Sequence, residues 1–231
     1  MLLDLLFDLF KGIIEPLDAL LILVYSVTAL MLVFPVHECA HGLMAYALGD
    51  KTAKYQGRLT LNPIAHVDLK GFLFLLFFGF GWARPVEFDP RNFKNRRVGT
   101  ILTAAAGPLS NILFCFISLL IYGILLVFGI QNDVTWMLYL AELFQIMAVY
   151  NATFAVFNLI PFPPLDGSKI VGELLPLRTR IKYYQLEQYS FIFFLVLIIT
   201  LNRIDILGFF SNAILNGFFP IVESILGGIF G

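Results

Sequence analysis

Long apolar stretches constrain this chain more than any other feature of its sequence. A helix that crosses a bilayer needs about 20 mostly apolar residues. Four stretches reach or approach that length: Leu17–Leu48, Val98–Ile130, Trp136–Ile160 and Tyr184–Leu201. Only 13% of the 231 residues are charged, whereas a soluble domain carries about 25%. The sequence therefore predicts an all-α membrane protein, a helical bundle of about four transmembrane helices.

Three shorter or interrupted segments are expected to lie at the membrane surface. Residues 1–16 begin with Asp4, Asp8 and Lys11 at helical spacing among Leu and Phe, which is typical of an amphipathic helix. Phe72–Phe80 is too short to cross a bilayer, and Trp82 follows it, so we expect a re-entrant or β-hairpin segment. The tail Ile206–Phe230 is interrupted by glycines and by Pro220, and we expect it to be interfacial or weakly inserted.

The positive charges are distributed unevenly, and this predicts an orientation. Residues 50–97 and 161–183 contain 13 of the 15 Lys and Arg residues, and the link 131–135 contains none. Loops rich in Lys and Arg stay in the cytoplasm, so both basic loops should face inward in a multi-pass protein of the cell membrane. The net charge of −1 provides no basic field for nucleic acid.

The first apolar stretch carries a metal-binding pattern near its end. His37 and His41 are four residues apart and share one face of a helix, and Glu38 borders that face. This HExxH spacing is typical of a zinc site with the glutamate as general base. The alternative, a pair of core histidines, is disfavoured because unpartnered ionisable groups inside a membrane cost about 2–3 kcal/mol each.

Two histidines leave a catalytic zinc one protein ligand short. A third histidine six residues after His41 is absent, because Ala47 stands there. The candidates are His66, the one remaining histidine, and a carboxylate, of which Asp166 is the best placed. Asp166 follows the proline-rich end of the third stretch, and the predicted topology brings it to the same side as the two histidines.

These motifs together resemble a known family. HECAH at 37–41 followed by NLIPFPPLDG at 158–167 is similar to the site-2 protease family of zinc intramembrane metalloproteases. The motifs at 62–68, 81–86 and 106–111 resemble its compact prokaryotic branch without PDZ or CBS domains, although Leu69 stands where that branch usually has proline. The resemblance covers roughly residues 33–172. It implies that His37, His41 and Asp166 hold Zn²⁺ and that Glu38 is the catalytic base.

If the chain is such a protease, further residues are expected to contribute to its site. Asn158 and Asn111 are candidate donors to the oxyanion of the reaction, or helix–helix hydrogen bonds. His66 could orient a ligand or touch substrate, or be a surface residue. Residues 72–86, with Trp82 and Val86, could pair with an unwound transmembrane substrate, or simply pack. The chain is expected to be one membrane-embedded peptidase domain, with a catalytic core at 17–182 and C-terminal helices at 183–231.

The sequence is compatible with two other function classes. Intramembrane histidines and carboxylates also build ion paths, so a transporter or metal carrier is an alternative. A scaffold that has lost activity is a second alternative, although Glu38 is present. The sequence favours the prediction of a zinc endopeptidase that cuts transmembrane substrates near the cytoplasmic side of the lipid bilayer.

Overall fold

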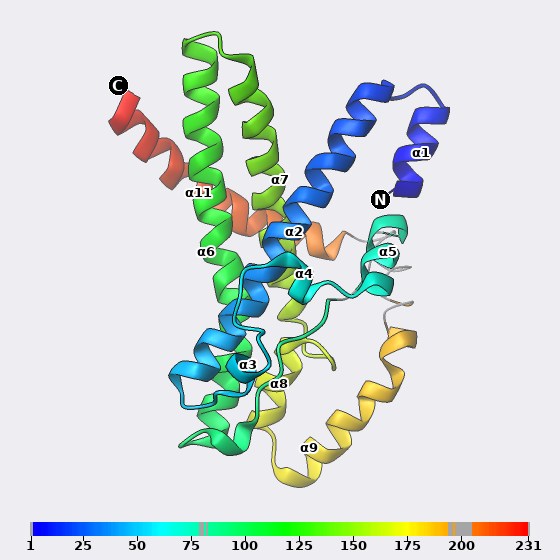
Figure 1. Cartoon of the computed structure of the whole chain (residues 1–231), viewed down its shortest axis with the longest axis vertical. Helices are drawn as coiled ribbons and strands as arrows, with labels where there is room; N and C mark the ends of the chain where they lie inside the picture. The colour runs from blue at the N-terminus through cyan, green and yellow to red at the C-terminus, as the bar shows by residue number, and fades with distance from the viewer. Residues whose placement is uncertain (1, 79–80, 82, 194–195, 197–204, 231) are drawn as a thin grey trace.

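The structure is a computed structural model that describes residues 2–78, 81, 83–193, 196 and 205–230. These residues are mainly helical, as Figure 1 shows. The α-helices (α) and 3-10 helices (η) are α1 Leu2–Phe10, α2 Pro16–Ala47, α3 Thr52–Tyr55, α4 Pro63–His66, α5 Leu69–Phe78, η1 Pro90–Asn92, α6 Arg96–Gln131, α7 Thr135–Asn158, α8 Asp166–Leu174, α9 Leu177–Tyr184, η2 Gln185–Tyr189 and α11 Ile206–Phe230. The predicted all-α class is confirmed for this part of the chain.

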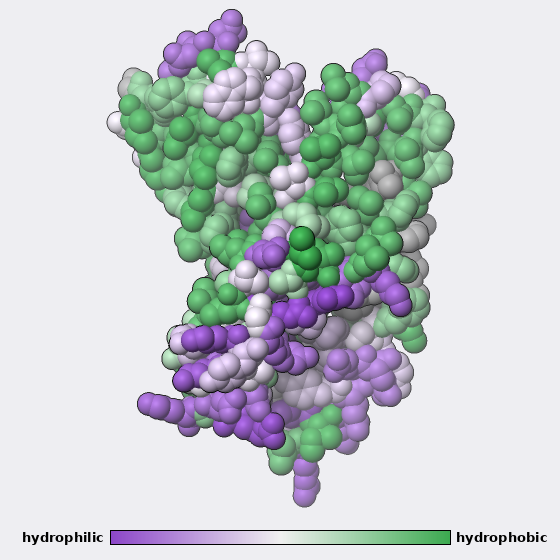
Figure 2. Space-filling view, in the orientation of Figure 1, coloured by the Kyte–Doolittle hydropathy of each residue, from purple (hydrophilic) through white to green (hydrophobic). Residues whose placement is uncertain are grey.

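Four of the described helices, α2, α6, α7 and α11, are long and apolar enough to cross a membrane. The first three coincide with the predicted stretches to within a few residues. Figure 2 shows that the upper part of the molecule in this view presents a mostly apolar surface, and that polar residues gather at the lower end. This is the architecture of a multi-pass membrane protein.

The fourth candidate span lies elsewhere than expected. Residues 206–230 form one continuous helix, α11, although glycines and Pro220 interrupt its sequence, and its depth of insertion stays a prediction. Leu215 and Val222 of α11 are buried in a cluster with Cys115 and Leu119 of α6 and with alanines of α7. This packing offsets the cost of about 3 kcal/mol that Pro220 imposes inside a helix. Of the expected span 184–201, the described part includes η2, and residues 194–195 and 197–204 lie outside the described residues.

The segment expected to be re-entrant or a β-hairpin is partly helical. Residues 69–78 form α5, and residues 81 and 83–89 have no regular secondary structure. The α5 sequence LKGFLFLLFF contains four leucines, which are good helix formers, and no β-branched residue. The described part of this segment contains no strand, Trp82 lies outside the described residues, and the re-entrant path stays a prediction.

Small side chains bring the central helices together. Helices α6 and α7 form an antiparallel hairpin, and α2 crosses it and diverges from α7 toward the top of Figure 1. The buried face of α7 is built from alanines, Ala141, Ala148, Ala152 and Ala155. Small residues at a helix interface let the backbones approach closely without a large apolar driving force. This close approach brings polar side chains of α2, α6 and α7 within hydrogen-bonding distance of one another.

A buried aspartate ties the end of α2 to the segment that precedes α6. Asp50 is fully buried and accepts hydrogen bonds from Thr52 N (3.1 Å) and Thr52 Oγ1 (2.6 Å). It also accepts from Asp89 N at 2.8 Å and from Asn92 Nδ2 at 2.7 Å. Burial alone would raise the pKa of Asp50, but these four donors outweigh it and hold the pKa below its ordinary value.

Replacing Asp50 by Ala should therefore destabilise the protein by on the order of 3 kcal/mol, because buried donors lose their acceptor. Since the folded-state pKa is depressed, the contribution of Asp50 is complete above the unfolded pKa of about 3.9 and is lost as pH falls through the folded value. Thermal unfolding in detergent between pH 7 and pH 3 measures both effects.

The matched control is Asp133→Asn, an exposed loop position with a φ of 54° that asparagine tolerates. It should leave the melting temperature nearly unchanged. An Asp50→Ala variant as stable as the Asp133→Asn variant would show that the Asp50 hydrogen bonds do not hold this loop.

Candidate metal centre

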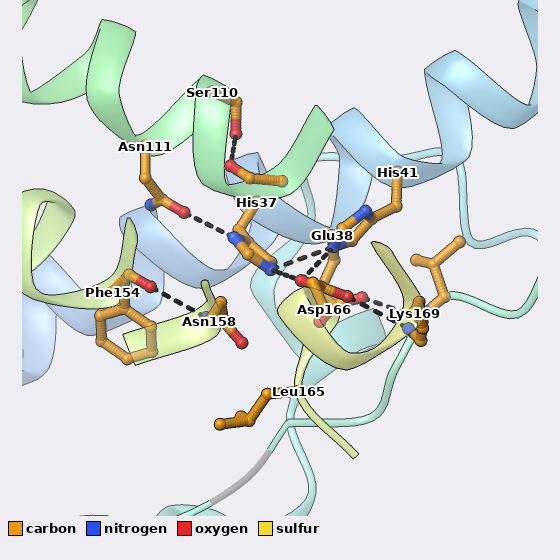
Figure 3. Close-up of polar contacts among 12 residues, drawn as sticks. His37, Glu38, His41, Ser110, Asn111, Phe154, Asn158, Leu165, Asp166 and Lys169 are labelled. Atoms are coloured by element: carbon orange, nitrogen blue, oxygen red, sulfur yellow. Dashed lines mark hydrogen bonds and ion pairs between the residues drawn. The ribbon is translucent and has the colours of Figure 1, made fainter. Parts of the chain in front are cut away.

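His37, His41 and Asp166 converge on one point inside the protein. His37 and His41 lie on α2, and Asp166 is the first residue of α8. The distance between the two Nε2 atoms is 3.1 Å, and Asp166 Oδ2 lies 3.1 Å from His37 Nε2 and 3.0 Å from His41 Nε2. All three residues are buried, and their ligand atoms are close enough to hold one metal ion. Figure 3 shows the three side chains pointing toward one another.

The opposite nitrogen of each imidazole is held by an acceptor. His41 Nδ1 donates to the backbone carbonyl oxygen of Thr103 on α6 at 2.7 Å. A carbonyl oxygen can only accept, so the proton of the neutral ring must sit on Nδ1. His41 Nε2 then presents a lone pair toward Asp166.

His37 is oriented in the same way by a chain of amides. Asn151 Nδ2 on α7 donates to the carbonyl oxygen of Met147 (2.9 Å), so Asn151 Oδ1 accepts from Asn111 Nδ2 (2.8 Å). Asn111 Oδ1 is therefore left to accept from His37 Nδ1. The carbonyl of Met147 thus fixes the direction of every hydrogen bond up to His37, whose Nε2 also presents a lone pair.

The positions of the three candidate ligand atoms are explained better by a shared metal ion than by hydrogen bonds among the three atoms. Two imidazole lone pairs and a carboxylate oxygen lie about 3 Å apart, and one proton could bridge only one of the three pairs. With Zn–ligand bonds of 2.0–2.1 Å, the edge of a zinc tetrahedron is about 3.3 Å. The observed spacing is close to that edge, and the donor set of two nitrogens and one oxygen is that of many catalytic zinc sites.

Helix α6 provides a close-fitting wall beside the two rings. A Cβ atom placed on Gly107 would lie 2.5 Å from His41 Cε1 and 2.6 Å from His37 Cε1. No side chain larger than hydrogen fits between the α6 backbone and the imidazoles. Gly107 is therefore required by the packing of the site.

Glu38 lies beside the three residues and has one backbone partner. Its Oε2 accepts from Val86 N at 2.7 Å. Val86 belongs to the irregular segment 83–89, so this segment covers one side of the site. This contact helps to fix the position of the carboxylate. Val86 N binds Oε2 and does not bind Oε1.

A cavity of about 420 Å³ opens onto the three residues and Glu38. Its walls are mostly apolar, with phenylalanines and prolines from α2, α7 and the loops. The lining residues of the described chain are Phe34, His37, Glu38, His41, Gly81, Ala83, Pro85, Val86, Phe154, Phe157, Asn158, Pro164, Leu165, Asp166, Lys169 and Phe191. A polypeptide segment with apolar side chains matches such a cavity in chemistry.

Of the other three candidate residues, Asn158 lines the cavity, whereas Asn111 and His66 do not. Asn158 lines the cavity, and its Nδ2 donates to Phe154 O at 3.1 Å, which leaves its second N–H available. Asn111 is buried behind the His37 ring and does not line the cavity. His66 is also fully buried, at the end of α4, where Nε2 donates to Thr60 O at 2.8 Å, and it is outside the described lining.

Four contacts of the site were not predicted from the sequence, although Val86 was expected to lie beside the substrate. They are the amide of Asn151, the carbonyl of Thr103, the backbone N–H of Val86, and Lys169, whose Nζ lies 3.1 Å from Asp166 Oδ1. Lone amides such as Asn151 inside an apolar span are a sequence signal, because polar groups there need a partner. Backbone partners give no such signal.

Replacing Gly107 by Ala should displace the imidazoles and weaken zinc binding. We expect a loss on the order of 10- to 100-fold in zinc affinity, the range typical of changes that reorient metal ligands. Competition with a chelating dye on purified protein measures it. The control is Gly217→Ala on α11, where an added Cβ meets nothing within 4 Å; equal zinc affinity in the two variants would contradict the packing argument.

Replacing Asn111 by Leu should also weaken zinc binding, because His37 Nδ1 loses the acceptor that sets its tautomer. The expected loss is about tenfold or more, measured by the same competition. An Asn132→Leu variant, altered at the exposed end of α6, is the matched control. Unchanged affinity in the Asn111 variant would show that the amide chain does not orient the ligand.

Comparison with known proteins agrees with this geometry. A family model for Peptidase family M50 matches residues 25–201. The protein named "Putative zinc metalloprotease YwhC" of Bacillus subtilis is 43% identical over 176 residues, which cover 76% of this chain and 80% of that protein.

More distant relatives carry a similar name. "Putative zinc metalloprotease Rip2" of Mycolicibacterium smegmatis is 26% identical over 198 residues, and Rip2 of Mycobacterium tuberculosis is 28% identical over 196 residues. In both comparisons the match covers 82% of this chain and 73% of the relative. No solved structure matches the chain. The resemblance drawn from the motifs is confirmed: the chain belongs to peptidase family M50, the site-2 protease family of zinc metalloproteases.

Proposed function

We propose that this protein is an intramembrane endopeptidase that hydrolyses peptide bonds of transmembrane substrates near the cytoplasmic face of the cell membrane. The observation that carries the proposal is the convergence of His37, His41 and Asp166 beside Glu38 in a cavity lined mostly by apolar side chains. In this proposal the three convergent residues hold Zn²⁺, and Glu38 is the catalytic base.

The position of the site supports cleavage close to one membrane face. His41 is six residues before the end of α2 at Ala47, which is about 9 Å along a helix axis. Helices α3, α8 and α9, in the basic segments 50–97 and 161–183, lie at the lower end of Figure 1, where Figure 2 shows the polar surface. Since basic loops stay in the cytoplasm, the site opens toward that side in our proposal.

Zinc, when bound, supplies a Lewis acid that makes water a nucleophile near neutral pH and polarises the scissile carbonyl. Glu38 takes a proton from the attacking water on the carboxylate oxygen that Val86 does not occupy. It later delivers this proton to the departing amine. Asn158 lines the cavity and has a second N–H beyond the one bonded to Phe154 O, so it is the donor for the developing oxyanion in this proposal.

The substrate must lose its helical structure at the cleavage point. Carbonyl groups within a helix are already hydrogen-bonded, and open backbone is not tolerated in lipid. The cavity provides a place for an unwound segment beside aromatic side chains. Among these, Phe34 and Phe154 pack edge to face with ring centres 4.7 Å apart. The irregular segment 83–89 flanks this place, so its backbone is a candidate partner for the unwound chain.

Glu38→Gln tests the proposal. The amide retains an acceptor for Val86 N and has nearly the same size, so zinc binding should persist. It cannot take up a proton, so cleavage of a panel of single-span membrane substrates should fall by 10²- to 10⁴-fold. Zinc content and product formation in liposomes are measured on the same preparation.

Glu87→Gln, one residue beyond Val86 and exposed, is the matched control and should cleave normally. Full activity in the Glu38 variant would exclude general base catalysis by this residue. A change in metal flux without any change in proteolysis would favour a carrier instead.

A further inference from the structure

We propose that Lys169 is a positioning residue that holds Asp166 to a single-oxygen contact with the metal and so keeps one coordination position open. This inference rests on the zinc site proposed above and goes beyond it. It concerns a residue outside the HExxH motif, three residues after Asp166 on α8.

The two oxygens of Asp166 have different partners. Oδ2 faces both histidines, at 3.0 and 3.1 Å, whereas Oδ1 lies 3.1 Å from Lys169 Nζ. Figure 3 shows the lysine on the side of the carboxylate away from His37. Because the ammonium group binds Oδ1, the carboxylate would have to break this ion pair to turn both oxygens toward the point where the ligand atoms converge.

The number of Asp166 oxygens that face the metal determines how many coordination positions remain for water and substrate. A catalytic zinc keeps three protein ligands and one open position. If Asp166 bound through both oxygens, the second oxygen would compete for the position that faces the cavity and Glu38. A one-oxygen contact leaves that position to water and substrate.

Lys169 has a second contact, with an aromatic ring. Its Nζ lies 5.6 Å from the centre of the Phe88 ring, and Phe88 packs on Phe93 with ring centres 5.9 Å apart. This is the range of a cation–π contact. Phe88 is two residues after Val86, whose N–H holds Glu38. The segment 83–89 therefore anchors the base directly and the carboxylate ligand through Lys169.

Two features separate this arrangement from an ordinary helical ion pair. Asp166 is only 5% exposed, and the Lys169 side chain is 34% exposed and lines the cavity. Exposed pairs three residues apart on a helix contribute little because water screens them. Here one partner is buried and also faces the two imidazoles, so the geometry of the pair sets the geometry of the site.

The test compares Lys169→Met with Lys169→Arg in purified protein loaded with Zn²⁺ or with Co²⁺ as a spectroscopic probe. For Lys169→Met we expect a 10- to 100-fold loss of zinc affinity. We also expect the visible absorption of bound Co²⁺ to become weaker, because a higher coordination number lowers its intensity. Lys169→Arg keeps a cation that can bind Oδ1 and should restore most of both properties.

Lys182→Met, which removes a charge from α9 at the same end of the molecule, is the matched control and should match the wild type. Wild-type zinc affinity and Co²⁺ spectrum in Lys169→Met would overturn the inference. So would failure of Lys169→Arg to restore the spectrum when Lys169→Met has lost it.

A second variant keeps the inference testable if Lys169→Met does not fold. Phe88→Leu removes the ring over the ammonium but leaves the Lys169–Asp166 pair, so it should shift the Co²⁺ spectrum in the same direction by a smaller amount. A wild-type spectrum in this variant would count against the inference. Failure of the proposed function itself looks different, because then wild-type protein would bind no stoichiometric zinc or would cleave none of the substrates.

Discussion

The repulsion among three lone-pair atoms is the constraint on which the rest of the site depends. Backbone and amide acceptors behind His37 and His41 select the neutral tautomer in which both rings present Nε2 lone pairs toward Asp166 Oδ2. Held about 3 Å apart in a buried setting, these atoms destabilise one another unless a cation lies among them. The hydrogen bonds from each imidazole Nδ1 therefore fix the geometry of the candidate metal site together with His37, His41 and Asp166 themselves.

Helix packing makes this arrangement possible. Thr103, Gly107 and Asn111 lie on α6 at spacings of four residues, so one face of that helix supplies a carbonyl acceptor, a close-fitting backbone and an amide to α2. Alanines on α7 allow Asn151 to reach Asn111. Glycine and alanine at these contacts thus serve the site directly, since bulkier residues would separate the helices that carry the ligands and their partners.

The sequence predicted much of this and missed what depends on tertiary contact. HExxH spacing predicted that His37 and His41 converge, because helical periodicity fixes which side chains share a face. The predicted topology brought Asp166 to the same side, and the three residues do lie together. Asn111 was expected to be either an oxyanion donor or a helix–helix hydrogen bond, and in the structure its amide bonds His37 on α2 and Asn151 on α7. Val86 N and the Thr103 carbonyl are backbone groups, which no residue type reveals. The tail 206–230 was expected to be broken because glycines and Pro220 weaken an isolated helix, but packing of Leu215 and Val222 on α6 and α7 outweighs that local preference.

X-ray absorption at the zinc edge would show which atoms surround the metal in the purified protein. We expect one zinc per chain, bound only by nitrogen and oxygen at about 2.0–2.1 Å, with the scattering of two imidazoles. A shell that contains sulfur, a shell with one imidazole or none, or protein purified without stoichiometric zinc would contradict this expectation.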